Sequence, residues 1–166
     1  MGFHHVPVLL AEVLTYLAPR QGGRYMDGTV GGAGHSAAIL KEAGAQAHLI
    51  GFDQDPRALA AAEQRLQPYG GQVTLVHENF RRLRQVAEQL DVVGKVDGIL
   101  LDLGVSSHQL DEVDRGFMYR MDAPLDMRMN PQGALTAAQI VNTYPSPSRN
   151  PMEPSMVSVE TVFFPN

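Results

Sequence analysis

Short apolar segments alternate with helix-forming segments from Arg24 to Asp102, and this alternation limits the fold more than any other feature. We expect strands at 24–27, 47–52, 73–77 and 96–101, the last of them buried. Helices are expected at 8–17, 36–43, 56–66 and 83–90. Strands separated by helices of this length pair in parallel, with right-handed crossovers. The sequence therefore predicts an α/β fold with a doubly wound, Rossmann-like parallel sheet.

Composition excludes several kinds of site. The chain has no cysteine, so disulfides, thiolate nucleophiles and Cys-based zinc sites are absent. The histidines lack helical ligand spacing, and no metal site is predicted. No apolar run approaches the roughly 18 residues of a membrane-spanning helix, so we expect a soluble, cytoplasmic protein with no membrane partner. The net charge of −5 does not favour a nucleic-acid binder. A local basic cluster such as Arg81, Arg82 and Arg84 can still act beneath an acidic total.

A glycine-rich loop from Gly28 to Gly34 joins the first expected strand to the helix that follows. Glycines let the backbone turn sharply and let a ligand approach closely, and a helix N-terminus favours carboxylate or phosphate. About 20 residues further on, Asp53 ends the second strand, where a carboxylate can accept hydrogen bonds from both hydroxyls of a ribose. Loop and acid together are typical of a nucleoside-cofactor site. The alternative, in which the glycines only form turns, would leave Asp53 unexplained.

The loop alone does not decide which cofactor binds. Gly32, Gly34 and Ala37 also fit the dinucleotide-binding spacing, which leaves an NAD-type oxidoreductase as an alternative. Asp27 favours S-adenosylmethionine, because it ends the first strand where a methyltransferase needs an acid near the amino-acid end of the cofactor. Phe80 follows the third strand and provides an aromatic ring on which adenine can stack. We therefore predict S-adenosyl-L-methionine as the cofactor.

Asp102 ends the fourth strand and is the candidate catalytic residue. An exocyclic amine conjugated to a pyrimidine is a poor nucleophile. An acceptor that binds its N–H can hold the nitrogen lone pair toward the methyl donor, so that positioning supplies much of the rate. A contact between Asp102 and the cofactor, or a buried Asp that caps the next turn, are the alternatives.

Seven segments have the order and spacing of successive blocks of a known family. They are HVPVLL at 5–10, DGT at 27–29, GHS at 34–36, DQDP at 53–56, DLGVSS at 102–107, RGF at 115–117 and PLDMRM at 124–129. Over the range from His4 to about Tyr144 the chain resembles the RsmH (MraW) family of S-adenosylmethionine-dependent methyltransferases.

The resemblance implies a function and a set of site residues. It implies methylation of N4 of a cytidine in the decoding region of 16S ribosomal RNA, in the small ribosomal subunit. The cofactor contacts it implies are Ala33, Gly34, His35, Asp53, Phe80, Asp102 and Gln109, to which Asp27 is added from its position. The substrate side would include Arg115, Phe117, Arg120 and Arg128. Arginines there can contact phosphates, and Phe117 or Tyr119 can stack on a displaced base. Solvated arginines on an ordinary loop are the alternative.

We predict three parts of the chain. Residues 1–110 form a partial methyltransferase domain of class I, and residues 111–144 begin the substrate-recognition region. A long loop is expected at 104–131 and a short helix at 136–143. Residues 145–166 form an irregular Pro/Ser-rich tail that does not resemble the family. We therefore expect a chain truncated or frameshifted after about Tyr144, with a sheet incomplete on its C-terminal side. A non-catalytic remnant is the alternative to an active enzyme.

Overall fold

A computed structural model describes residues 7–144, apart from the side chains of Ser107 and His108. The predicted irregular tail at 145–166 lies outside these residues. The strands are β1 (Arg24–Asp27), β2 (His48–Asp53), β3 (Val73–His77) and β4 (Gly98–Leu100). The α-helices are α1 (Leu10–Leu17), α2 (Gly34–Ala43), α3 (Pro56–Leu66), α4 (Leu83–Gln89), α5 (Ser107–Asp111) and α6 (Ala137–Thr143). Short 3-10 helices are η1 (Gln67–Gln72), η2 (Phe80–Arg82) and η3 (Val113–Arg115).

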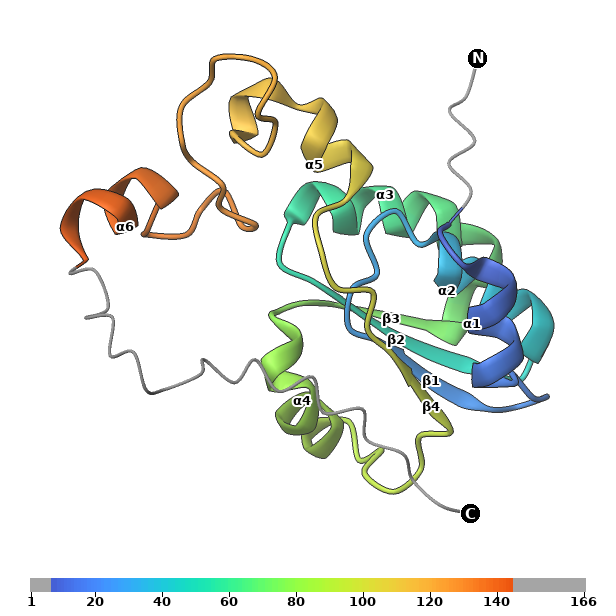
Figure 1. Ribbon diagram of the computed structural model, residues 1–166. Helices are drawn as coiled ribbons and strands as arrows, with labels where there is room; N and C mark the ends of the chain where they lie inside the picture. Colours follow the sequence, from blue (N-terminus) through green and yellow to red (C-terminus); the bar gives the residue numbers. More distant parts are fainter. Residues whose placement is uncertain (1–6, 145–166) are drawn as a thin grey trace, which may run out of the picture.

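The four strands form one parallel sheet in the order β3-β2-β1-β4 (Figure 1). β1 lies inside the sheet, where Tyr25 is opposite Leu49 on one side and Gly98 on the other. α2 and α3 lie on one face and α4 on the other, as right-handed crossovers require when the chain passes from β1 outward to β3 and then returns to the other side of β1 as β4. The fold is therefore the predicted doubly wound, Rossmann-like α/β fold.

Side chains of the strands alternate between two cores, because successive residues of a strand point to opposite faces. Tyr25 and Leu49 belong to the core on the face covered by α1, α2 and α3. Met26, Ile50 and Phe52 belong to the core on the other face, where α4 contributes Val86. Figure 1 shows α4 on this second face, opposite the other three helices.

Capping residues determine where the best predicted helices begin. Asp55 accepts a hydrogen bond from the backbone N–H of Arg57 and precedes Pro56, which starts α3. Thr136 and Gln139 form a reciprocal capping box at the start of α6. Two other starts were misplaced: α1 begins at residue 10 and not 8, and α2 at residue 34 and not 36.

The prediction of a buried fourth strand is wrong. β4 has only three residues and lies at the edge of the sheet, paired with β1 alone among the described strands. Ile99 and Leu101 are 46% and 45% exposed. The largely apolar segment at 96–101 resembles a buried strand. Burial also needs a neighbouring strand on each side, and the described part of the chain provides only β1 as a neighbour of β4.

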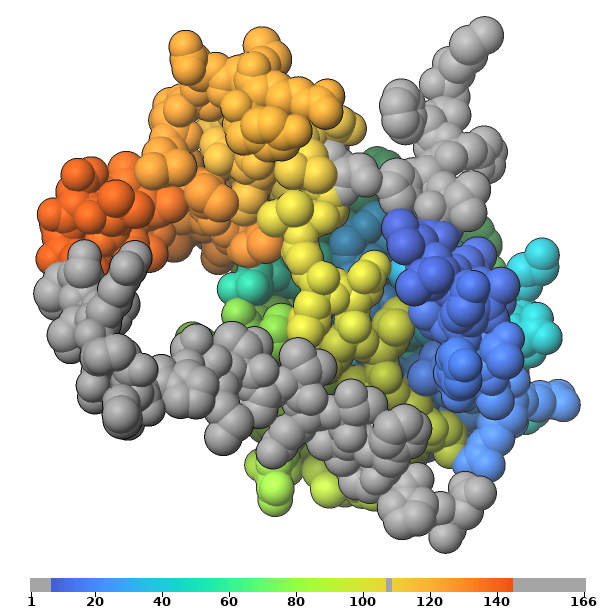
Figure 2. Space-filling model, viewed as in Figure 1, coloured from blue at the N-terminus to red at the C-terminus, as the bar shows by residue number. Residues whose placement is uncertain are grey.

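Beyond β4 the chain forms a lobe at the carboxyl end of the sheet. Figure 2 shows residues from α5 to α6, coloured yellow to red, as a mass that projects from the sheet and its helices. The loop expected at 104–131 contains α5 and η3, and α6 matches the helix expected at 136–143. Within the described residues, no helix is long and apolar enough to cross a membrane.

Candidate cofactor site

The glycine loop between β1 and α2 is held by the strands on both of its sides. The N–H of Gly28 donates to the carbonyl of Leu100, and the N–H of Val30 donates to the carbonyl of Phe52, each at 2.9 Å. The loop ends at Ala33, which is fully buried with φ at 57° and has no side-chain cap to offer α2. The first N–H groups of α2 therefore have no side-chain acceptor at the helix start.

Asp27 is buried at the end of β1, directly before the loop. Its Oδ2 accepts a hydrogen bond from Ser36 Oγ at 2.6 Å, and its Oδ1 accepts one from the N–H of Thr29 at 3.0 Å. Burial raises the pKa of the Asp27 carboxyl, while these hydrogen bonds act in the opposite direction. Asp27 therefore links the two ends of the loop.

Asp53, the last residue of β2, contacts the glycine loop directly. Its Oδ2 accepts a hydrogen bond from the N–H of Gly31 at 2.9 Å, and its Oδ1 accepts one from the N–H of Asp55 at 2.9 Å. Loss of hydration raises the pKa of Asp53, against the effect of these backbone hydrogen bonds. Each carboxylate oxygen can accept more than one hydrogen bond, so two further donors can bind.

His35 and Asp102 come together beside the loop. The buried His35 lies in the first turn of α2, with Nε2 2.9 Å from the carbonyl oxygen of Val8 and Nδ1 3.9 Å from Asp102 Oδ2. The backbone N–H of Asp102 donates to Thr29 Oγ1 at 2.8 Å. We expected Asp102 to end a buried strand. This expectation is wrong, because the Asp102 side chain is 57% exposed.

The other two predicted cofactor residues occupy different surroundings. Phe80 is half-buried at the start of η2, where a Cβ added to Gly28 would lie 3.0 Å from its own Cβ. It therefore lies next to the first residue of the loop. Gln109 is buried in α5, where its Oε1 accepts a hydrogen bond from the N–H of Ser106 at 3.0 Å. The Gln109 side chain thus serves the start of its own helix.

The predicted substrate arginines divide into internal and exposed residues. Arg115 is buried, and its guanidinium is 2.6 Å from Asp55 Oδ2. Arg128 forms a bidentate pair with Asp126 and also donates to the carbonyl of Gly133 at 2.7 Å. Hydrogen bonds from Arg128 lower the pKa of Asp126 to about 2. Both guanidinium groups therefore fix the fold of the loop around them.

The remaining predicted substrate residues are more accessible. Phe117 is half-buried, and the Arg115 guanidinium lies 5.8 Å from the centre of its ring. Arg120 is exposed, and its guanidinium lies 5.7 Å from the ring centre of Tyr119, which is 89% exposed. Among the predicted substrate residues, Arg120 is thus the arginine with most access to an external ligand, and the exposed ring of Tyr119 lies beside it, in contact with its guanidinium.

The sequence interpretation missed the contributions of Thr29, Ser36 and Asp55. Thr29 accepts the backbone N–H of Asp102, and Ser36 donates to the Asp27 carboxylate. They lie in the DGT and GHS segments, in which neither residue was assigned a role. Asp55 belongs to the DQDP segment at 53–56, but the sequence does not show that it binds Arg115 in addition to capping α3. The repeat of an acid at 53 and 55 is the signal that could have pointed to its second role.

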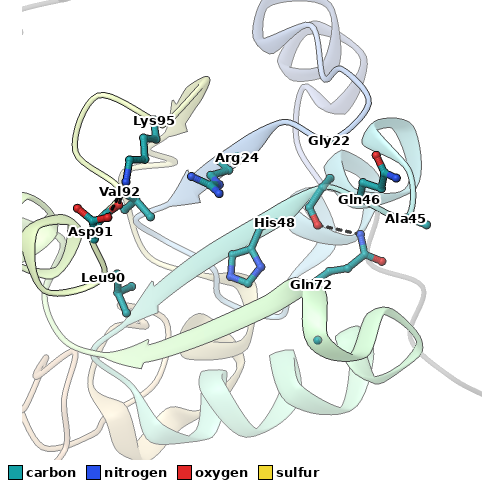
Figure 3. A pocket seen from close by; sticks show the side chains of 12 residues that line it. Gly22, Arg24, Ala45, Gln46, His48, Gln72, Leu90, Asp91, Val92 and Lys95 are labelled. Atoms are coloured by element: carbon teal, nitrogen blue, oxygen red, sulfur yellow. Dashed lines mark hydrogen bonds and ion pairs between the residues drawn. The ribbon is translucent and has the colours of Figure 1, made fainter.

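A cavity of about 750 Å³ lies elsewhere (Figure 3). Arg24 and His48, the first residues of β1 and β2, line it together with Gln72, Asp91 and Lys95. It therefore opens at the amino ends of the strands, and it contains none of the predicted site residues. Ligands of open α/β sheets bind at the carboxyl ends, so this cavity does not serve as the cofactor site.

A parallel sheet with a glycine loop after β1 and an acid at the end of β2 defines the class of α/β proteins that bind a nucleoside cofactor. Comparison with known families identifies the branch of that class. The model of the MraW methylase family matches residues 2–149, and the chain belongs to this family. Family membership overturns the NAD-type oxidoreductase alternative.

Two of the similar curated proteins share one name. The chain is 67% identical over 145 residues to "Ribosomal RNA small subunit methyltransferase H" of Heliobacterium mobile, covering 87% of this chain and 46% of that protein. It is 61% identical to the protein so described from Heliobacterium modesticaldum, with the same coverage. The chain thus spans about half the length of these relatives. A solved rRNA methylase of Clostridium thermocellum aligns over 49% of this chain and 46% of its own, with a TM-score of 0.43 and 20% identity, which is too weak a likeness to weigh.

Proposed function

We propose that this chain carries the cofactor-binding half of an S-adenosylmethionine-dependent methyltransferase that acts on N4 of a cytidine in the decoding region of 16S rRNA. The contact between Gly31 N–H and Asp53 Oδ2 supports this proposal most strongly, because it brings the ribose acceptor against the glycine loop. Family membership supplies the reaction class, and the described relatives act on small-subunit rRNA by name.

The residues around the loop fit a nucleoside cofactor with a charged amino-acid end. Asp53 can accept both ribose hydroxyls, since its two oxygens keep free lone pairs beside the backbone bonds they accept. Phe80 lies beside Gly28 at the start of the loop and would offer its ring to the adenine. Asp27 lies at the base of the loop and would supply negative charge for the amino group of the cofactor. Ala33, Gly34 and His35 would contact the cofactor through the uncapped start of α2.

Asp102 is the residue that we assign to the target amine. When bound, S-adenosylmethionine would supply an electrophilic methyl group on a sulfonium. The methyl carbon would bond to N4 as its bond to sulfur breaks, leaving S-adenosylhomocysteine, and one proton of N4 would pass to Asp102 or to water. Thr29 fixes the backbone of Asp102. Among the described residues its carboxylate makes only the 3.9 Å approach to His35. An exposed carboxylate of this kind can accept a hydrogen bond from an incoming amino group and orient its lone pair.

Base and phosphate contacts would come from the lobe beyond β4. Arg120 and Tyr119 are exposed together and can bind a phosphate and stack on a base. Arg115, Phe117 and Arg128 would support this surface from behind, because Arg128 pairs with Asp126 within the lobe, Arg115 lies over the Phe117 ring, and Arg115 also binds Asp55 at the start of α3.

Calorimetric titration of the purified chain with S-adenosylhomocysteine, and separately with NAD, tests the proposal at its first step. We expect saturable binding of S-adenosylhomocysteine and no heat from NAD. Binding of NAD alone, or of neither compound, would overturn the cofactor assignment. Transfer of a labelled methyl group to small-subunit rRNA by a full-length relative then tests the substrate. Cofactor binding without transfer by this chain would favour the non-catalytic remnant.

A further inference from the structure

A continuous series of short contacts leads from the proposed ribose acceptor to the lobe. Asp53 Oδ1 accepts the N–H of Asp55 at 2.9 Å, and Asp55 Oδ2 binds the guanidinium of Arg115 at 2.6 Å. Asp55 is 2% and Arg115 8% exposed in their side chains. Residues 53 and 115 are far apart in sequence, yet only one residue separates them along this path.

Arg115 continues the series into the segment that carries the proposed substrate residues. Its second terminal nitrogen donates to the carbonyls of Arg128 and Met129, each at 2.9 Å. Its own carbonyl accepts the N–H of Met127 at 3.0 Å. One side chain thus joins α3 to both ends of the loop formed by residues 115–129.

Stability alone does not account for this arrangement. A buried ion pair loses the hydration of both charges, and apolar residues of similar size often stabilise a fold as well or better. A guanidinium fixes the direction of several hydrogen bonds at once, which an apolar contact cannot do. The buried pair is also little affected by salt. Asp55 and Arg115 are therefore suited to hold geometry between two sites.

We infer that Arg115 is a positioning residue that couples the cofactor site to the substrate segment, residues 112–133. The inference rests on the proposed function, since it takes Asp53 as the ribose acceptor. A ribose bound to Asp53 restrains its carboxylate, the carboxylate restrains the backbone of Asp55, and Asp55 restrains Arg115. Ordering produced by one ligand lowers the ordering that the second must supply, so cofactor and RNA would each strengthen the binding of the other.

Hydrogen exchange of the backbone amides at 112–133, with and without S-adenosylhomocysteine, tests the coupling without any activity measurement. In the wild-type chain we expect the cofactor product to slow exchange there by about fivefold or more. Arg115→Gln should bind S-adenosylhomocysteine and protect the glycine loop, yet lose the slowing at 112–133. Arg115→Lys keeps a charge for Asp55 but not the planar fork, so it should slow exchange to an intermediate degree.

Arg57→Gln is the matched control. Arg57 binds Glu112 at 2.6 Å and also joins α3 to the segment, but its side chain is 59% exposed. Its guanidinium does not bind the Asp55 carboxylate, which accepts the Arg57 backbone N–H, a donor that the substitution keeps. We expect wild-type slowing in this variant. The inference is overturned if exchange at 112–133 slows equally in Arg115→Gln and in the wild type. It is also overturned if the wild type binds S-adenosylhomocysteine without any slowing at 112–133. Either result leaves the proposed function standing. Failure of the wild type to bind S-adenosylhomocysteine overturns both. If Arg115→Gln does not fold, Arg115→Lys is the test. Slowing of exchange at 112–133 in Arg115→Lys equal to that in the wild type would overturn the coupling.

Discussion

Asp27 and Ser36 are joined by a hydrogen bond of 2.6 Å between two buried side chains. Asp27 ends β1 and Ser36 lies in the first turn of α2, so this bond closes the glycine loop at its base. The pKa of Asp27 is raised by burial and is held down in part by this bond. The shape of the loop and the ionisation of Asp27 therefore depend on each other.

Removal of the Ser36 hydroxyl is expected to destabilise the fold in a pH-dependent manner. The folded-state pKa of Asp27 lies above its unfolded value, so burial of the ionised carboxyl lowers stability once the pH rises above that unfolded value. The Ser36 bond offsets part of this loss. Ser36→Ala should lower the free energy of unfolding by about 1–3 kcal/mol near pH 7, and by less as the pH falls and Asp27 is protonated in both states.

Urea unfolding near pH 7 and near pH 3 measures both quantities. Thr15→Ala is the control, since it removes an exposed hydroxyl that bonds only to a helix carbonyl, and it should show no pH-dependent difference. A penalty for Ser36→Ala that is the same at both pH values would contradict the link to Asp27.

Asp53→Ala should weaken the binding of S-adenosylhomocysteine by about 1.5–3 kcal/mol, because charge-assisted hydrogen bonds to the ribose are lost. Calorimetry gives the affinity, and thermal unfolding checks that loss of the bonds from Gly31 and Asp55 has not opened the loop. Glu63→Ala, at an exposed acid of α3, is the control and should bind normally. Unchanged affinity in Asp53→Ala would remove this residue from the site.

Asp102→Ala, made in a full-length relative with the same motif, should depress methyl transfer far more than stability. The side chain is exposed and contributes little to packing here, whereas the target amine would lose its acceptor. Asp102→Asn keeps one acceptor oxygen without the charge, and should retain part of the activity if positioning is the main effect. Normal single-turnover methylation of small-subunit rRNA by Asp102→Ala would rule out the assigned role.

Gly116→Ala should be much more damaging than Gly94→Ala, although both glycines have nearly the same left-handed φ, 71° and 72°. A Cβ at position 94 meets nothing within 4 Å, so only backbone strain of about 1–2 kcal/mol is expected. At position 116 the added Cβ would overlap the carbonyl oxygen of Pro124 and lie 2.9 Å from the nitrogen of Asp126. A total of about 2–4 kcal/mol follows.

Thermal unfolding and limited proteolysis between residues 112 and 133 measure the two glycine variants. Gly116→Ala should open this segment to cleavage first, because the overlap lies within it. Equal behaviour of the two variants would mean that the segment does not pack as described.

Ile50→Ala and Ile99→Ala test the position of β4. Both side chains lie on the face covered by α4, but Ile50 is 3% and Ile99 46% exposed. Ile50→Ala should cost about 2–4 kcal/mol, and Ile99→Ala well under half of that. Chemical unfolding of both variants gives the comparison. Equal losses would show that Ile99 is covered in solution.

Local signals in the sequence were sufficient for the central part of the fold. The strands expected at 24–27 and 73–77 and the helix expected at 56–66 match β1, β3 and α3. The sequence assigned the glycine loop and Asp53 to one cofactor site, and the two are in contact. These features depend on neighbours in the chain or on the regular geometry of a parallel sheet, so a single sequence carries them.

Features that depend on distant partners could not be predicted. The exposure of Ile99 depends on which strands flank β4, and the apolar run itself does not record this. The sequence shows Arg115 as a charge near other site residues, but not that Asp55, 60 residues away, engages it. This pairing is fixed by tertiary contacts and not by local propensity.

The strand order also lets the sheet follow the order of synthesis. β2 joins β1 on one side, β3 then adds outside β2, and β4 takes the opposite side of β1. No strand must be inserted between two that are already paired, so each can dock on an existing edge as it leaves the ribosome. Once β4 has docked, the backbone contacts that hold the glycine loop, from Leu100 and Phe52, are both in place. A ligand of that loop could therefore begin to stabilise a growing chain well before its synthesis ends.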